Sequence, residues 1–316
     1  MIKNSAKNTL VPFNFENVLE AIPELKTEQL NINNISTKNP IDSSDINQKN
    51  WTEITHIIND HYASYDSFVV LHGTDTMAYT ASALSYMLEN LNKAVILTGS
   101  QIPIGERRTD AKENLITAVE IASSGKVNEV CIYFEDQLYR GNRTVKINTD
   151  HFEAFCSPNF PVIAEAGVKI KYNYSFNTKK ERFKAHYETS NDVAILKLFP
   201  GIKNKTIEAI IDSAKGIVIE SFGSGNAPNS YELSNILVKA NKNGKILLNT
   251  TQCVYGSATS GNYQTSLSLK EAGVICGKDM TTEAAITKLM FLLKTGLNDS
   301  QIKTKLQENL RGEITS

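Results

Sequence analysis

A hydroxyl and a carboxylate stand side by side at Thr74 and Asp75, within the run Leu-His-Gly-Thr-Asp-Thr-Met at 71–77. A short apolar segment precedes the run, and apolar residues at helical spacings of three and four follow it, so we expect a strand and then a helix. Such turns lie at the carboxyl edge of an α/β sheet, where ligands bind beside free helix amides. The pair could attack a carbonyl and hold an ammonium. Its other interpretation is a helix N-cap, where Thr and Asp are common.

From the residues alone, Ser43 and Ser44 in an Asp-Ser-Ser-Asp run indicate a turn or helix cap. A threonine hydroxyl is too weakly acidic to attack unaided and needs a base. A lysine can be one, because burial disfavours its charged form. Lys146, judged alone, would be a surface residue, since lysines are rarely buried.

The run at 71–77 resembles the second signature of the L-asparaginase/glutaminase amidohydrolases, and its continuation to Leu84 is similar to the cytosolic, bacterial type I branch. The resemblance covers nearly the whole chain in the expected order. Five other segments carry it: Asp-Ser-Ser-Asp at 42–45, Leu-Thr-Gly-Ser-Gln-Ile-Pro at 97–103, Leu-Tyr-Arg-Gly-Asn-Arg-Thr at 138–144, Gly-Asn-Ala-Pro at 225–228 and Asn-Leu-Arg-Gly-Glu at 309–313.

The resemblance implies hydrolysis of the side-chain amide of L-asparagine to L-aspartate and ammonia, without a cofactor. It makes Thr74, Asp75 and Lys146 the second of the family's two triads. Asp75 would also pair with the α-ammonium of the substrate, as a charge-assisted hydrogen bond favours. Ser43 and Ser44 would grip its α-carboxylate.

The family's other triad starts from an apolar strand that ends in Thr-Gly-Gly-Thr-Ile-Gly, whose second Thr is generally taken as the nucleophile. Met1–Asn4 resembles the segment immediately after this motif, so the first strand of the family fold is absent from this chain. We expect the natural polypeptide to carry the strand and its threonine. The alternative is a degenerate, non-catalytic homologue.

The remaining members of that triad are a tyrosine and a glutamate. Leu10 stands where the tyrosine is expected, two residues before Pro12, and Tyr263 is the candidate to replace it. A partly buried loop aromatic is the other interpretation of Tyr263. Glu283 matches the glutamate; alone it would be a first-turn helix acid favoured by the helix dipole. In the family, Glu283 and Asn226 would come from a neighbouring subunit, which implies at least an intimate dimer and commonly a homotetramer.

Apolar segments alternate with helical patterns along the chain, which predicts α/β domains with mainly parallel sheets. Its 316 residues suit two domains, and a polar link at 188–191 separates a domain of residues 1–190 from one of 191–316. The resemblance implies a larger, flavodoxin-like N-terminal domain with the catalytic residues and a smaller, Rossmann-like C-terminal one. We expect strands at 66–71, 94–98 and 129–134, and buried strands at 193–198, 216–220 and 245–248.

Three finer structural expectations accompany this outline. A helix should begin near Thr109, with Asp110 and Glu113 placed for a capping box. Segments 168–172 and 183–187 should pair as a hairpin. Later helices are expected near 206–214, 231–243, 282–293 and 301–310.

The composition excludes several classes of function. Lys plus Arg (33) nearly balances Asp plus Glu (34), without a basic stripe, so neither nucleic acid nor an anionic membrane is an expected partner. Four cysteines lack paired spacing and five histidines are scattered, which argues for a reducing, cytoplasmic setting without a metal site. No apolar stretch approaches the ~20 residues that a membrane-spanning helix needs.

Other functions stay open at this point. A superfamily alternative is an amidotransferase subunit that supplies ammonia to mischarged glutamyl-tRNA. Glutamine could replace asparagine as substrate, since one methylene changes discrimination by only about 1–3 kcal/mol. A binding protein, rather than an enzyme, is the other alternative: a sensor that binds asparagine and lacks the nucleophile. The presence of Lys146 argues against it, because binding alone needs no base.

Overall fold

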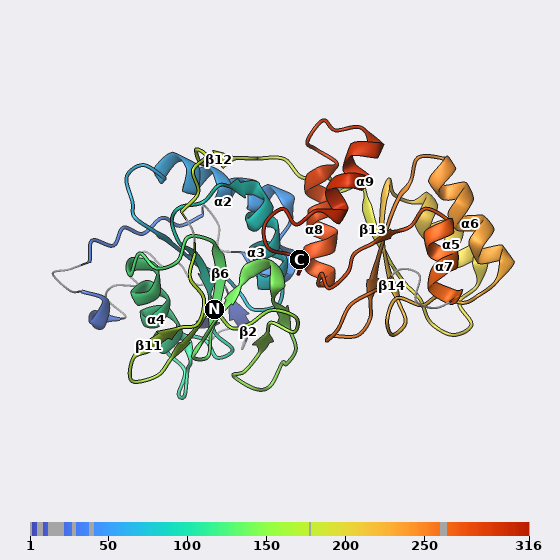
Figure 1. The fold of residues 1–316 in the computed structure, drawn as a ribbon. Helices are drawn as coiled ribbons and strands as arrows, with labels where there is room; N and C mark the ends of the chain where they lie inside the picture. Colours follow the sequence, from blue (N-terminus) through green and yellow to red (C-terminus); the bar gives the residue numbers. More distant parts are fainter. Residues whose placement is uncertain are drawn as a thin grey trace. The chain divides into compact units, whose positions relative to one another are not determined.

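The computed structural model describes most of the chain, and two α/β units make up the described part (Figure 1). The described residues are 2–4, 9–11, 22–26, 30–37, 41–176, 178–259 and 264–315, with the backbone alone described at 2–4, 9–11 and 264–266. The first unit contains 1–81, 88–157 and 161–185, and the second contains 82–87, 158–160 and 186–316. The division into domains 1–190 and 191–316 stays a prediction.

A six-stranded mixed sheet lies at the centre of the first unit. Strands β3, β5 and β6 are parallel, and they confirm the three strands expected in this half of the chain. Strands β7, β10 and β11 are antiparallel to their neighbours. In spatial order the sheet is β11 (Ile170–Tyr172), β10 (Ala164–Ala166), β7 (Gln137–Arg140), β6 (Val130–Phe134), β5 (Val95–Thr98) and β3 (Phe68–Leu71).

The expectation of mainly parallel sheets is therefore wrong for this sheet. Its antiparallel half begins where β6 turns directly into β7 through Glu135 and Asp136. Both residues have positive φ, 41° and 59°. Two central residues with positive φ define the type I′ turn that suits a tight hairpin, and Asp tolerates that region better than most residues.

Three helices accompany this sheet: α2 (Gln48–His61), α3 (Met77–Met87) and α4 (Ala111–Ser123). Helix α3 confirms the helix expected after Thr74 and Asp75, and α4 packs against β3, β5 and β6. The capping box expected at the start of α4 is wrong, because the Asp110 side chain makes no cap hydrogen bond. Its carboxylate instead accepts the backbone N–H groups of Gln101 and Ile102, at 2.9 and 3.0 Å.

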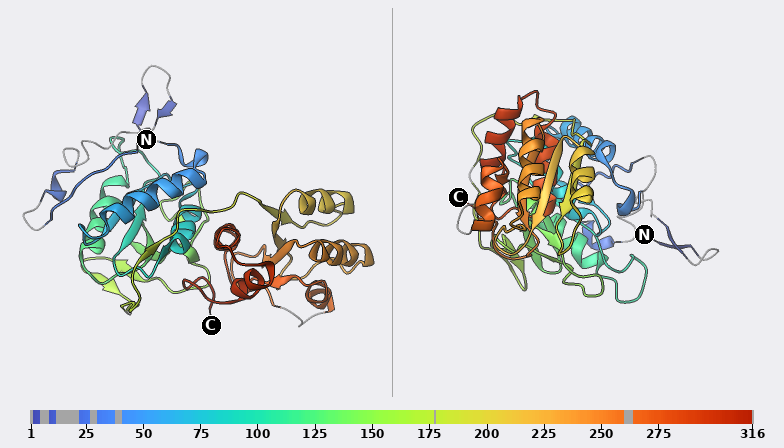
Figure 2. Two further views of the ribbon diagram at one scale, coloured as in Figure 1. Left: turned by 90° about the horizontal axis from the view of Figure 1, so that it is seen from above. Right: turned by 90° about the vertical axis from the view of Figure 1, so that its right-hand side faces the viewer.

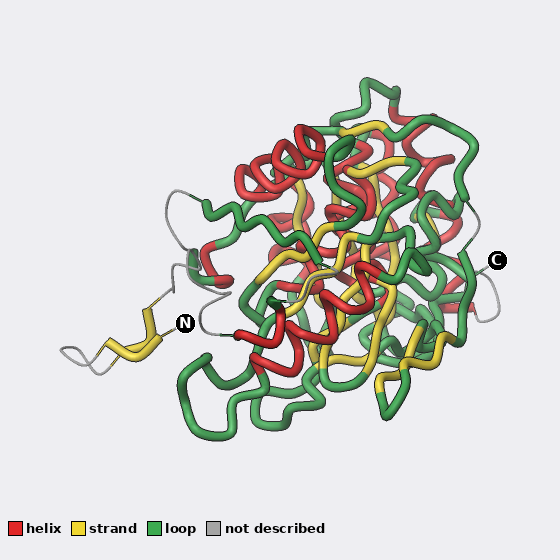
Figure 3. Tube along the Cα trace, turned by 90° about the vertical axis from the view of Figure 1, so that its left-hand side faces the viewer, coloured by secondary structure: helices red, strands yellow, loops and turns green. Residues whose placement is uncertain are grey.

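Short antiparallel pairs complete the first unit. They are β1 (Ile2–Asn4) with β2 (Thr9–Val11), β8 (Val145–Lys146) with β9 (Phe155–Cys156), and β4 (Leu88–Glu89) with β12 (Lys184–Ala185). The first of these pairs is the yellow one beside the N label in Figure 3. The expected hairpin of 168–172 with 183–187 is wrong. Strand β11 pairs with β10 and β12 pairs with β4, so each segment finds a partner elsewhere.

The second unit is a parallel sheet between two layers of helices (Figures 1 and 2). Helices α8 (Thr282–Leu292) and α9 (Asp299–Gln307) cover one face, and α5, α6 and α7 cover the other. This unit confirms the expected parallel arrangement. The other elements are β13 (Val193–Lys197), α5 (Asn204–Asp212), β14 (Gly216–Ser221), α6 (Tyr231–Lys242), β15 (Ile246–Thr251), α7 (Gln264–Glu271) and β16 (Ile275–Cys276).

The core of the second unit lies between its sheet and the layer of α5, α6 and α7. Leu196 and Ile219 from the strands are buried there with Ile211 from α5 and Leu237 from α6. Burial of such side chains contributes roughly 1.5–3 kcal/mol each, which stabilises the strand ends that carry the loops. Within the described residues, no helix is long and apolar enough to cross a membrane.

Candidate active site

Thr74, Asp75 and Lys146 form one hydrogen-bonded cluster in the first unit. The Lys146 Nζ donates to Thr74 Oγ1 at 2.8 Å and to Asp75 Oδ1 at 2.6 Å. The side chain of Lys146 is 16% exposed, whereas that of Asp75 is 64% exposed. The cluster thus combines a shielded amine, a hydroxyl in contact with it and a carboxylate that a ligand can reach from solvent.

The local folding of two distant segments creates this cluster. Thr74 and Asp75 occupy the turn between β3 and α3, while Lys146 ends β8, where pairing with β9 fixes its backbone. The turn needs Gly73, because a Cβ there would stand 2.6 Å from the Ser43 Oγ. A larger residue would therefore push the serine segment away from the turn.

The predicted carboxylate-binding serines lie against this turn, on the short helix η3 (Ser43–Asp45). Ser43 is buried, and its carbonyl oxygen accepts a hydrogen bond from Thr76 Oγ1 at 2.6 Å. Ser44 is exposed, and its hydroxyl donates to Asp42 Oδ1 at 2.9 Å. Ser43 therefore lies next to the Thr74 turn, and the Ser44 hydroxyl is hydrogen-bonded to Asp42. That the two serines bind a carboxylate stays a prediction.

A neutral histidine supports the same turn. The His72 Nδ1 lies 2.6 Å from the Gly73 carbonyl oxygen, which can only accept, so Nδ1 carries the proton. Burial lowers the pKa of His72, which keeps the ring neutral, and Nε2 then accepts from Thr80 Oγ1 at 2.8 Å. Trp51 Nε1 donates in turn to that hydroxyl at 3.0 Å. This chain of bonds fixes the backbone that carries Thr74.

Sequence reasoning missed Gln101, which contacts the cluster directly. Its Oε1 accepts a hydrogen bond from Thr74 Oγ1 at 3.1 Å. The residue lies in the 97–103 segment that carries the family resemblance, and that was the available signal. Asn114 secures the start of this loop by donating to the Gly99 carbonyl oxygen at 3.0 Å.

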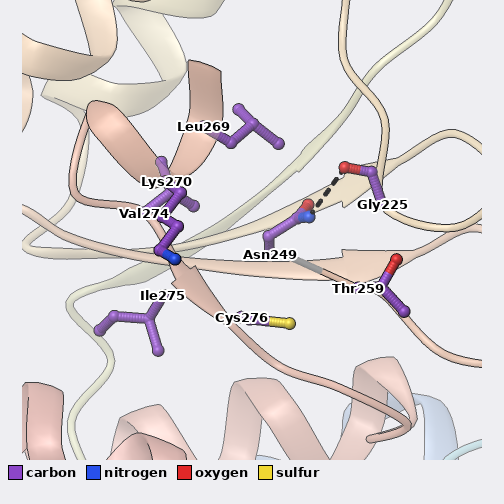
Figure 4. A pocket seen from close by; sticks show the side chains of 8 residues that line it. All are labelled: Gly225, Asn249, Thr259, Leu269, Lys270, Val274, Ile275 and Cys276. Atoms are coloured by element: carbon purple, nitrogen blue, oxygen red, sulfur yellow. Dashed lines mark hydrogen bonds between the residues drawn. The ribbon is translucent and has the colours of Figure 1, made fainter. Parts of the chain in front are cut away.

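Asn226 belongs to the second unit, in a tight loop after β14. Backbone hydrogen bonds of 2.8 Å in both directions join Asn226 to Phe222, and Gly225 adopts a φ of 101° that favours glycine. A small pocket beside this loop is lined by both polar and apolar residues, and the Asn249 amide reaches the Gly225 carbonyl oxygen (Figure 4). The side chains of Thr74, Asp75 and Lys146 are not among those that line it.

Glu283 also belongs to the second unit, in the first turn of α8. Burial raises the pKa of its carboxyl to about 7, and the nearby Glu220 carboxylate adds to the rise. A group with such a pKa exchanges a proton near neutral pH, as acid–base catalysis requires. The predicted role of Glu283 in catalysis stays a prediction.

This raised pKa predicts a pH-dependent stability. Between pH 4.5 and about 7 the folded chain keeps the Glu283 proton that the unfolded chain loses, so stability falls as pH rises through this window. The free energy of unfolding should fall by at most about 1.4 kcal/mol per pH unit, which is the value for one proton. Glu283→Gln should remove this contribution in urea unfolding measured from pH 5 to 8. Glu232→Gln is the control, because Glu232 is an exposed acid in the first turn of α6. This variant should keep the pH dependence of the stability.

Two other sequence-based expectations concern the first triad. Tyr263 lies outside the described residues, and only the backbone of Leu10 is described, within β2. In the described part of the chain, no group of three or more His, Cys, Asp or Glu side chains could hold a metal ion.

Comparisons with known proteins agree with the sequence motifs. The family "Asparaginase, N-terminal" matches residues 1–178, and "Glutaminase/Asparaginase C-terminal domain" matches residues 192–306. L-asparaginase 1 of Escherichia coli (strain K12) is 42% identical over 304 residues, covering 94% of this chain and 89% of that protein. A glutamyl-tRNA(Gln) amidotransferase subunit of Pyrococcus abyssi is 34% identical over 318 residues, covering 96% of this chain and 71% of that protein.

A solved structure shows the same fold over almost the full length. The crystal structure of L-asparaginase I from Vibrio cholerae superposes with a TM-score of 0.90 at 39% sequence identity, covering 97% of this chain and 94% of that one. The family matches span both halves of the sequence, and the relatives align over more than nine-tenths of it. The chain therefore belongs to the asparaginase family of amidohydrolases.

Proposed function

We propose that this protein hydrolyses the side-chain amide of L-asparagine to L-aspartate and ammonia. The observation that carries the proposal is the cluster in which Lys146 donates to both Thr74 and Asp75. A binding site alone would not need a shielded lysine on a threonine hydroxyl. The asparaginase relatives and their matching fold support the same assignment.

The proposed chemistry divides the tasks among the clustered side chains. The substrate's α-ammonium pairs with the exposed carboxylate of Asp75, and Ser43 and Ser44 receive its α-carboxylate. The Lys146 amine, once it has given one of its protons to water, takes the proton of the Thr74 hydroxyl while that oxygen attacks the amide carbon. The same proton leaves with ammonia, and water hydrolyses the resulting ester.

The finer parts of the proposal extend beyond the cluster. A larger flavodoxin-like domain and a smaller Rossmann-like domain, a cytoplasmic setting and a shared active site follow from the family. In that arrangement Glu283 and Asn226 of one protomer complete the site of another in an intimate dimer or tetramer. The pKa of Glu283 near 7 supports its acid–base role.

Asp75→Ala tests the substrate-binding role. Loss of the partner for the α-ammonium should raise KM by at least about 100-fold, because a charge-assisted hydrogen bond contributes about 1.5–3 kcal/mol and the uncompensated charge adds to the loss. Initial rates over a range of L-asparagine concentrations give kcat and KM separately. Asp60→Ala, at an exposed site near the end of α2, serves as control. An unchanged KM would remove Asp75 from this role.

The second candidate function is an ammonia-supplying amidotransferase subunit, favoured by the 34% identity to the Pyrococcus abyssi amidotransferase protein. It uses the same amide chemistry, so the two functions differ in the acceptor of ammonia. Release of free ammonia from L-asparagine without tRNA or another protein favours the asparaginase. Strict dependence on charged tRNA and a second protein favours the amidotransferase.

A further inference from the structure

The side-chain amide of Gln101 joins the Thr74 hydroxyl to the loop that follows β8. Its Oε1 accepts from Thr74 Oγ1 at 3.1 Å, and its Nε2 donates to the carbonyl oxygens of Thr149 and His151, each at 3.1 Å. Asp110 holds the Gln101 backbone through the 2.9 Å hydrogen bond to its N–H. Two carbonyl oxygens thus hold the side-chain nitrogen of Gln101, and Asp110 holds its backbone.

The directions of these hydrogen bonds are fixed by their chemistry. Backbone carbonyl oxygens only accept, so the Gln101 nitrogen must face Thr149 and His151, and the amide oxygen must face Thr74. The Thr74 hydroxyl must then be the donor to Gln101. Because it has a single proton, it cannot also donate to Lys146, which agrees with Lys146 donating to it as an ammonium.

We propose that Gln101 is a positioning residue that holds the Thr74 hydroxyl oxygen beside Lys146 Nζ. The proposal rests on the function proposed above and deepens it. The hydrogen bond from Thr74 Oγ1 to Gln101 Oε1 restrains rotation of the threonine side chain, so the oxygen stays 2.8 Å from Lys146 Nζ. The amide oxygen of Gln101 is too weak a base to take the proton. During attack the proton therefore turns to the Lys146 nitrogen while the oxygen keeps its place.

Gln101→Met tests the positioning role directly. Methionine has similar length but neither donates nor accepts a conventional hydrogen bond, so Thr74 loses its orientation. We expect kcat for L-asparagine to fall about 10- to 100-fold, because misoriented reacting groups cost up to about 10²-fold, with KM changed less than about threefold. KM is spared because Gln101 does not contact Asp75 or Ser43 in any bond described above.

Asn148→Ala is the matched control for an indirect effect through the loop. The Asn148 Oδ1 accepts the backbone N–H groups of Asp150 and His151, at 2.8 and 3.2 Å, so this change disturbs the same loop without touching Thr74. We expect kcat within about twofold of the unmodified protein, as for a surface change away from the reacting groups. A loss equal to that of Gln101→Met would show that Gln101 acts only through the loop and would overturn the proposal.

A second measurement separates this proposal from the proposed function. The side-chain rotamer of Thr74 can be followed by NMR of its 13C-labelled methyl group, with Thr74→Ser identifying the signal, and it needs no turnover. If the protein released no ammonia, the asparaginase proposal would fail while this measurement still tested Gln101. Averaging of Thr74 over several rotamers in Gln101→Met, with one rotamer kept in the unmodified protein and in Asn148→Ala, supports the proposal. One unchanged rotamer in Gln101→Met overturns it, whatever the activity.

Discussion

Lys146→Met is expected to lower kcat/KM for L-asparagine hydrolysis by about 10²–10⁴-fold, the range that a general base contributes. Methionine keeps the aliphatic length but cannot accept the proton of Thr74 or pair with Asp75, to which Lys146 donates at 2.6 Å. The fold should persist, because β8 keeps its backbone pairing with β9. Ammonia release and circular dichroism, measured on the same preparation, check both statements.

Lys171→Met is the control for this prediction. Lys171 lies in β11 of the same unit and is exposed, so the variant removes one positive charge without touching the cluster. It should keep the activity of the unmodified protein. Equal activity of Lys146→Met and Lys171→Met would mean that Lys146 is not the base.

Lys288→Met is expected to destabilise the second unit by about 3–5 kcal/mol, the cost of removing one partner of a buried ion pair. Lys288 and Glu313 are both fully buried, with Nζ and Oε1 2.5 Å apart. The Nζ also donates to the carbonyl oxygens of Leu306 and Glu308, at 3.1 and 2.6 Å. One ammonium on α8 therefore holds the end of α9 and the segment that follows it.

Urea unfolding of three variants checks this prediction. Lys288→Met with Glu313→Gln should recover more than half of the loss, because no unpaired charge is then buried and Gln can still accept a backbone N–H. Lys305→Met removes the exposed pair of Lys305 with Glu308, 2.6 Å apart, and should cost at most about 1 kcal/mol. A loss of stability in Lys288→Met as small as that in Lys305→Met would contradict the stabilising role of the Lys288–Glu313 pair.

The strands and the turn at Thr74 could be predicted because their signals are local. Apolar runs such as Val95–Thr98 and Val130–Phe134 leave few alternatives to a buried strand, and the helical spacing after Thr74 marks the start of α3. The position of Lys146 is different. Its 72-residue separation from Thr74 is closed by tertiary folding, so only the family resemblance placed it in the site.

The failed expectations involve side chains and edges whose partners lie far along the chain. Asp110 has the spacing of a helix cap, but its carboxylate meets two loop N–H groups that helix patterns do not show. Strand β12 pairs with β4 rather than with the nearer β11, because short edge segments take their register from packing. Gln101 was missed for a related reason, since an amide in a loop has no local pattern that indicates its contact with Thr74.

The most direct test of the central claim is ammonia release from L-asparagine by the purified protein, with L-aspartate quantified in the same samples. Lys146→Met is run beside it. We predict ammonia and L-aspartate in equal amounts from the unmodified protein and a rate lowered by at least about 100-fold in the variant. Absence of ammonia from the unmodified protein, or equal release by both proteins, would contradict an asparaginase that works through Thr74, Asp75 and Lys146.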